Sequence, residues 1–130
     1  MAITDFTITL CVSSRRHGVN DIARCIEAKP TRVSEASKAR DDYRVFWDFE
    51  HSRDEPFDDA CPRAVVWAGM CAGLLSCIDD AAVTLWCEVH SDSEFAGLTF
   101  QGEQLMDLGT RKIGLVLSVY TQPDASEVTD

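Results

Sequence analysis

Hydrophobic and polar residues alternate at several places along this chain of 130 residues, and such alternation predicts β-strands. The clearest example is the segment 6–12, where every second residue is apolar. Segments 43–49, 83–89 and 113–119 alternate in the same way. Turn residues after the third of these segments predict that a short strand at 95–100 forms a hairpin with it. We therefore expect five strands, with 113–119 central in the sheet because both of its faces have apolar character.

Three helices are expected between these strands. Apolar residues recur at helical spacing over 19–26, which predicts a first, short helix. A second helix is expected over 62–78, with Pro62 at its first position, and it is apolar nearly all round. Residues 102–108 predict a short third helix, closed by Gly109 as a left-handed residue past its end.

The order β-α-β-α-β-β-α-β predicts an α+β fold, in which a mostly antiparallel sheet has helices packed on one face. A parallel α/β sheet is the alternative. We expect one domain over residues 1–120 and a flexible acidic tail over 121–130. Residues 31–42 mix both charges with few large apolar side chains, so they predict a surface connection that contributes nothing to the core.

Composition narrows the classes of partner. Acidic residues number 22 against 12 lysines and arginines, and the formal net charge of −10 disfavours direct contact with nucleic acids or anionic membranes. No uncharged run approaches the roughly 20 residues of a membrane-spanning helix. The chain has six cysteines, and its first residues lack the features of a secretory signal. We therefore expect a cytoplasmic protein whose cysteines are thiols, most of them in the core.

Two stretches resemble a known protein family. The segment from Phe95 to Tyr120 is similar to the closing segment of the bacterial family called domain of unknown function 4279, in which a glycine-leucine strand leads into a short helix and a final strand ends in tyrosine. The segment from Asp21 to Thr31 is similar to that family's helix followed by proline-threonine, and Trp47 stands where a strand tryptophan is usual. These are packing and turn residues. The resemblance therefore implies a fold and a bacterial or bacteriophage source, and no catalytic residue.

No arrangement of residues predicts a metal, a cofactor or a catalytic centre. Cys87 and His90 are three residues apart, but on a strand this spacing directs them to opposite faces. Neither a phosphate-binding glycine loop nor a nucleophile elbow occurs. One alternative is kept open: a small enzyme or ligand-binding domain that uses a cysteine, such as Cys25 or Cys61, with a histidine close in space.

The main hypothesis is a non-enzymatic binding protein that engages a basic protein partner, as inhibitors and immunity proteins do. The acidic residues after the second strand are the expected contact: Asp48, Glu50, Asp54, Glu55, Asp58 and Asp59. The same charges would also serve solubility alone. A third hypothesis is a homodimer joined through the apolar second helix, with Trp67, Met70 and Leu74 at the interface.

Overall fold

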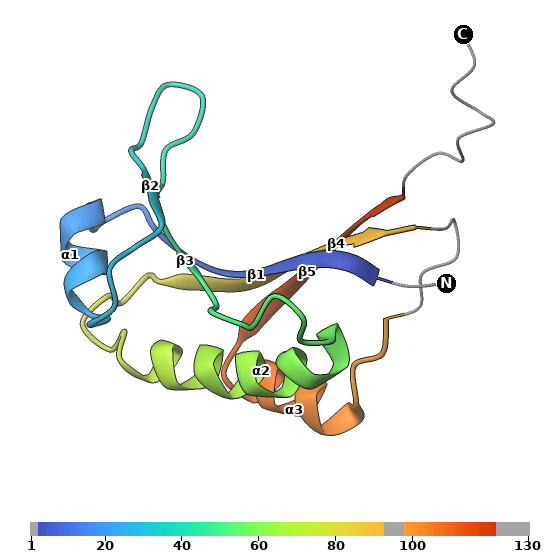
Figure 1. Cartoon of the computed structure of the whole chain (residues 1–130). Helices are drawn as coiled ribbons and strands as arrows, with labels where there is room; N and C mark the ends of the chain where they lie inside the picture. The colour runs from blue at the N-terminus through green and yellow to red at the C-terminus, as the bar shows by residue number, and fades with distance from the viewer. Residues whose placement is uncertain (1–2, 93–97, 122–130) are drawn as a thin grey trace, which may run out of the picture.

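The computed structural model describes residues 3–92 and 98–121 (Figure 1). The described residues form five strands and three helices, in the order β1 (Ile3–Ser14), α1 (Val19–Arg24), β2 (Arg32–Ser34), β3 (Tyr43–Asp48), α2 (Phe57–Gly73), β4 (Ala82–Ser91), α3 (Gly102–Thr110) and β5 (Ile113–Thr121). This arrangement confirms the α+β class. Within the described part of the chain, none of the helices combines the length and the apolar character needed to cross a bilayer.

The strands form one sheet in the order β2-β3-β1-β4-β5. All neighbouring strands are antiparallel except β4 and β5, which are parallel and are connected through α3. The three helices lie on one face of this mostly antiparallel sheet, as expected (Figure 1). The opposite face has no helix over it in the described part of the structure. Several of its side chains, among them Thr9, Trp86 and Glu88, are partly exposed, whereas Phe46 and Cys11 are buried.

The core lies between β1 and the helices. Alternation in β1 directs Ile8, Leu10 and Val12 to the helical face, where none of the three is exposed. Leu10 pairs with Trp47 on one side and with Leu85 on the other, so the buried faces of three adjacent strands are in register. The apolar pattern of the first strand therefore predicts the centre of the core.

Helix α2 begins earlier than the sequence predicts. The expected start at Pro62 is wrong, because Pro56 is the extended N-cap residue and the helix starts at Phe57. Phe57 and Cys61 are both buried, so the earlier start adds apolar contacts with the core. The free energy of this burial outweighs the loss of the backbone hydrogen bond that Pro62, inside the helix, cannot donate. The helix also ends earlier than expected, at Gly73.

Strand β5 is at the edge of the sheet, and the expectation that it is central is wrong. It pairs only with β4, and Leu117 and Val119 on its helical face stay about half exposed because the helices cover only its beginning. Gly109 lies inside α3, and the left-handed residue is instead Lys112, with φ of 57°. The chain thus turns from α3 into β5 without the help of a glycine.

Three further segments differ from expectation or lie outside the described residues. Residues 31–42 are more than a connection, because Arg32–Ser34 pairs with β3. Of the strand expected at 95–100, Leu98–Phe100 is not in a strand, and the rest lies outside the described residues. The tail expected at 121–130 also lies outside them, apart from Thr121, which ends β5.

Candidate binding site on the open sheet face

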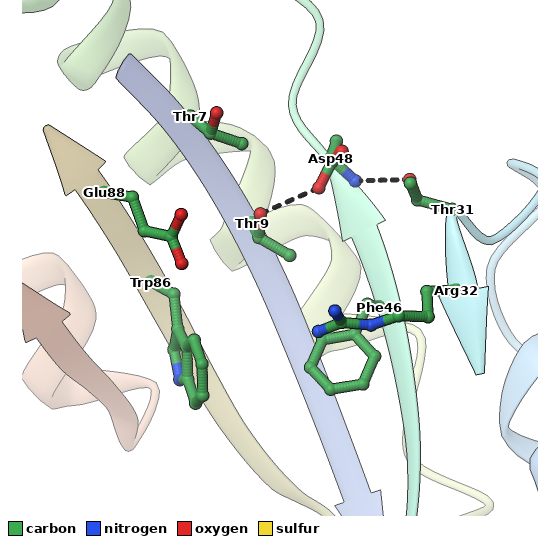
Figure 2. A pocket seen from close by; sticks show the side chains of 8 residues that line it. All are labelled: Thr7, Thr9, Thr31, Arg32, Phe46, Asp48, Trp86 and Glu88. Carbon is green, nitrogen blue, oxygen red and sulfur yellow. Dashed lines mark hydrogen bonds between the residues drawn. The ribbon is translucent and has the colours of Figure 1, made fainter. Parts of the chain in front are cut away.

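The open face of the sheet has a hollow of about 340 Å³ near its centre (Figure 2). Its walls combine hydroxyl, charged and aromatic side chains from four strands and the residue before β2. The lining residues are Thr7, Thr9, Thr31, Arg32, Phe46, Asp48, Trp86 and Glu88.

The register of the sheet explains why these side chains meet. Thr9 of β1 pairs with Asp48 of β3 and with Trp86 of β4, and paired residues point to the same face. Thr7 pairs with Glu88 one step further along. Phe6, Ile8, Leu10 and Val12 are buried on the helical face of β1, so the alternate residues, including both threonines, face the other side.

The two carboxylates of the hollow differ in their bonding. The Thr9 hydroxyl donates to Oδ1 of Asp48 over 2.8 Å, and the backbone N–H of Asp48 donates to the Thr31 hydroxyl over 2.9 Å. The side chain of Glu88 is partly buried and forms no hydrogen bond or ion pair with any described residue. A carboxylate in this setting retains unused acceptor capacity.

Aromatic rings form the apolar part of the hollow. Phe46 and Trp86 meet edge to face, with 6.4 Å between ring centroids and an interplanar angle of 75°. The Arg32 guanidinium carbon lies 4.1 Å from the centroid of Phe46, so Arg32 covers this ring, which is only 5% exposed. Arg32 has no ion pair among the described residues. The hollow therefore contains two carboxylates and one guanidinium.

The structure separates the six acidic residues that the sequence singles out. Asp48 lines the hollow, whereas Glu50 lines a neighbouring groove of about 530 Å³ that also contains Trp67. Glu55 is paired with Arg63, and Asp54 is exposed in the loop. Asp58 and Asp59 are in the first turn of α2. Negative charge at this end of a helix interacts favourably with the helix dipole, so these two residues stabilise the helix.

The hollow also includes residues that the sequence analysis does not select. Only Asp48 is a candidate site residue in the sequence, and the other lining residues are Thr7, Thr9, Thr31, Arg32, Phe46, Trp86 and Glu88. The alternation of β4 indicates two of these residues, Trp86 and Glu88, because they share the face opposite the buried residues of that strand. Sequence alone, however, does not show that β1 and β3 place Thr9 and Asp48 beside this face.

The residues expected at an apolar interface are divided by the structure. Trp67 packs against Phe49, with ring centroids 5.4 Å apart. Met70 and Leu74 are 68% and 53% exposed and form a stripe on the outer side of α2 with Val66. The homodimer hypothesis therefore concerns this stripe, and it stays a prediction.

The cysteines proposed for catalysis are not activated. Burial, followed by the charge of Asp58, raises the pKa of Cys61 to about 11. Burial and the hydrogen bond with Cys77 raise the pKa of Cys25 to about 11. His17 lines the same hollow as Cys25, but its Nε2 lies 3.2 Å from the carboxylate of Asp79. Thiols with raised pKa values are poor nucleophiles at neutral pH.

The turn after β1 and the turn before β4 together form a second cluster of titratable side chains. Ligand atoms of His17, Asp79 and Asp80 lie within 4.8 Å of one another. Asp79 also accepts a hydrogen bond from Arg16. Asp80 accepts from the Ser14 hydroxyl over 2.5 Å and from two backbone N–H groups of the turn. Both carboxylates are therefore engaged in hydrogen bonds within the protein, and we assign the cluster a structural role, which is to stabilise the turn after β1.

Comparison with protein-family models, with curated proteins and with solved structures gives no match for this chain. The resemblance to domain of unknown function 4279 therefore stays a prediction.

Proposed function

We propose that this chain is a non-enzymatic binding protein that engages a basic protein partner, and that the hollow on the open sheet face receives an arginine or lysine side chain of that partner. The observation that carries the proposal is the Glu88 carboxylate, which is partly buried, has no partner among the described residues and lies beside Trp86. An inhibitor-like or immunity-like role in a bacterium or bacteriophage belongs to the same proposal.

The chemistry of the hollow suits a planar cation. A guanidinium can lie over the indole of Trp86 and donate to Glu88 and Asp48, which combines a cation-π contact with charge-assisted hydrogen bonds. A cation-π contact contributes about 0.5–2 kcal/mol, depending on how far it is removed from water. Arg32 over Phe46 is an example of the same stacking within this chain. A partner's arginine would therefore meet a geometry that the protein already uses.

The overall charge supports the same class of partner. The formal net charge is −10, so the field of the whole protein attracts a basic partner and speeds its association. Long-range attraction of this kind does not need the hollow. The test must therefore separate binding in the hollow from attraction by charge in general.

Hexa-arginine peptide is a suitable probe, titrated at low ionic strength and followed by calorimetry and by backbone amide shifts. We expect the double variant Asp48→Asn/Glu88→Gln to lose affinity by about tenfold or more, since it removes both carboxylates from the hollow. Asp54→Asn/Asp58→Asn changes the net charge equally at exposed positions outside the hollow. This control is expected to lose less than about threefold.

The outcomes distinguish the possibilities. Equal losses in both double variants would show that attraction is diffuse and would reject the hollow as the contact site. A larger loss of affinity in the control would show that the peptide binds at the acidic loop and not in the hollow. Amide shifts centred on β1, β3 and β4 support the proposal. An affinity that falls as salt is added is expected for both kinds of attraction and does not distinguish them.

The alternative of a cysteine-dependent enzyme has less support, because burial raises the pKa values of the candidate thiols. It stays a prediction that slow alkylation of every thiol by iodoacetamide would reject.

A further inference from the structure

Two cysteines that are distant in the sequence lie side by side at one corner of the molecule. Cys25 is the C-cap residue of α1, and Cys77 lies in the turn between α2 and β4. They are 52 positions apart, yet their Sγ atoms are 2.9 Å apart. The other four cysteines are buried, as expected for core thiols. Cys25 and Cys77 depart from that expectation, because one is partly exposed and the other is exposed.

The surroundings of the pair allow small molecules to reach it. The two thiols line a surface hollow of about 320 Å³ together with His17, Asp21 and Arg24. A disulfide bond is about 2.05 Å long, so the sulfur atoms need to approach each other by less than about 1 Å. Cys77 is exposed and Cys25 is partly exposed, so their side chains have room to rotate toward each other.

We propose that Cys25 and Cys77 are a reversible modification site, at which a peroxide forms an intramolecular disulfide and a small thiol reductant reopens it. The proposal is independent of the binding function proposed for the sheet face.

The reaction balances with hydrogen peroxide as the oxidant. The more exposed Cys77 attacks one peroxide oxygen as its thiolate, the O–O bond breaks, and a sulfenic acid and hydroxide form, the latter becoming water with the thiol's proton. The Cys25 sulfur then attacks the Cys77 sulfur, the S–S bond forms, the S–O bond breaks and a second water leaves. In total, two thiols are oxidised to one disulfide and one peroxide is reduced to two waters.

The raised pKa of Cys25 agrees with this order of steps. Burial and the hydrogen bond with Cys77 keep the Cys25 thiol protonated at neutral pH, which disfavours it as the first nucleophile. It has the adjacent position required of a resolving thiol.

Formation of the disulfide would link the end of α1 covalently to the turn before β4. This helix has six residues and only two of them, Val19 and Ile22, are buried, so non-covalent contacts anchor it weakly. A crosslink over a separation of 52 residues removes considerable entropy from the unfolded chain. We expect the oxidised protein to melt roughly 5 to 15 °C higher than the reduced protein.

The test is to treat the folded chain with hydrogen peroxide, alkylate the remaining thiols under denaturing conditions and count them by mass spectrometry. Six alkylated thiols are expected before treatment, and two fewer afterwards, with one disulfide-linked peptide pair containing Cys25 and Cys77. Dithiothreitol should restore all six. Cys77→Ser and Cys25→Ser should each abolish the intramolecular disulfide and the rise in Tm, whereas Cys71→Ala, a buried thiol outside the pair, should retain both.

Peptide mapping of the wild type does not depend on whether any variant folds. Retention of all six thiols after peroxide treatment would overturn the proposal. A disulfide that maps to another pair, or one that forms equally in Cys77→Ser, would overturn it as well.

Discussion

The hydroxyl of Thr9 donates a 2.8 Å hydrogen bond to Oδ1 of Asp48, directly across the pairing of β1 with β3. This bond orients one of the two carboxylates of the hollow, while Glu88 on the other side of β1 has no such partner (Figure 2). A carboxylate held in one orientation loses less entropy when a ligand binds.

Replacing Thr9 by valine is therefore expected to weaken binding of the hexa-arginine peptide by about two- to fivefold, because Asp48 loses the donor that orients it. Thr7→Val is the matched control. Thr7 lines the same hollow but forms no hydrogen bond with Asp48. Calorimetric titration measures both affinities, and equal losses in the two variants would contradict the orienting role of Thr9.

The buried indole of Trp47 is expected to be a major determinant of stability. Its Nε1–H donates a 2.8 Å hydrogen bond to the carbonyl of Ala28, and the side chain is 2% exposed. Trp47→Phe leaves that carbonyl without its donor and creates a cavity, which together should lower the free energy of unfolding by about 2–4 kcal/mol. Trp67→Phe changes a partly exposed ring and should cost about 1 kcal/mol or less. Urea denaturation measures the free energy of unfolding of both variants. Similar losses in the two would contradict the larger role of Trp47.

The turn after β1 should make stability depend on pH. The hydrogen bond from Ser14, together with backbone N–H groups of the turn, lowers the pKa of Asp80 to about 2. The pKa is lower in the folded state than the unfolded value of about 3.9, so the ionised carboxylate stabilises the fold above pH 4. This contribution is lost as the pH falls through about 4 toward about 2.

Asp80→Asn should therefore be less stable than the wild type at pH 6, and the difference should shrink as the pH falls through that window. Urea denaturation at a series of pH values measures the difference between the two proteins. Asp54→Asn, in the exposed loop, is the charge-matched control. If the profiles of Asp80→Asn and the wild type ran parallel, the lowered pKa would not contribute to stability.

The outer stripe of α2 is expected to contribute little to the stability of the fold. Met70 is 68% exposed, so Met70→Asp should change the free energy of unfolding by no more than about 0.5 kcal/mol. Ala68, two residues earlier, is fully buried, and Ala68→Asp should cost at least about 3 kcal/mol. A large loss in Met70→Asp would contradict this assignment.

Sedimentation of the same proteins tests the homodimer hypothesis. A wild type that sediments as a dimer and a Met70→Asp variant that sediments as a monomer would support an interface on this stripe. A monomeric wild type at high concentration would reject the hypothesis.

The sequence by itself predicts which residues of a strand share a face, because alternation with a period of two depends only on local geometry. It indicates the buried face of β1 correctly, and it identifies Asp48 as a candidate contact residue. It misplaces the start of α2, since only packing against the core shows that Phe57 and Cys61 belong to that helix. The position of β5 at the edge also depends on pairing that no local pattern encodes.

Tertiary structure alone decides which distant residues become neighbours. Thr9, Asp48 and Trp86 form one row because β1 lies between β3 and β4, and Cys25 meets Cys77 because the end of α1 reaches the turn before β4. Such contacts join segments tens of residues apart, and their register is selected by burial of the whole sheet face. The local pattern determined the faces of the strands, and the long-range pairing assembled the hollow and the cysteine pair.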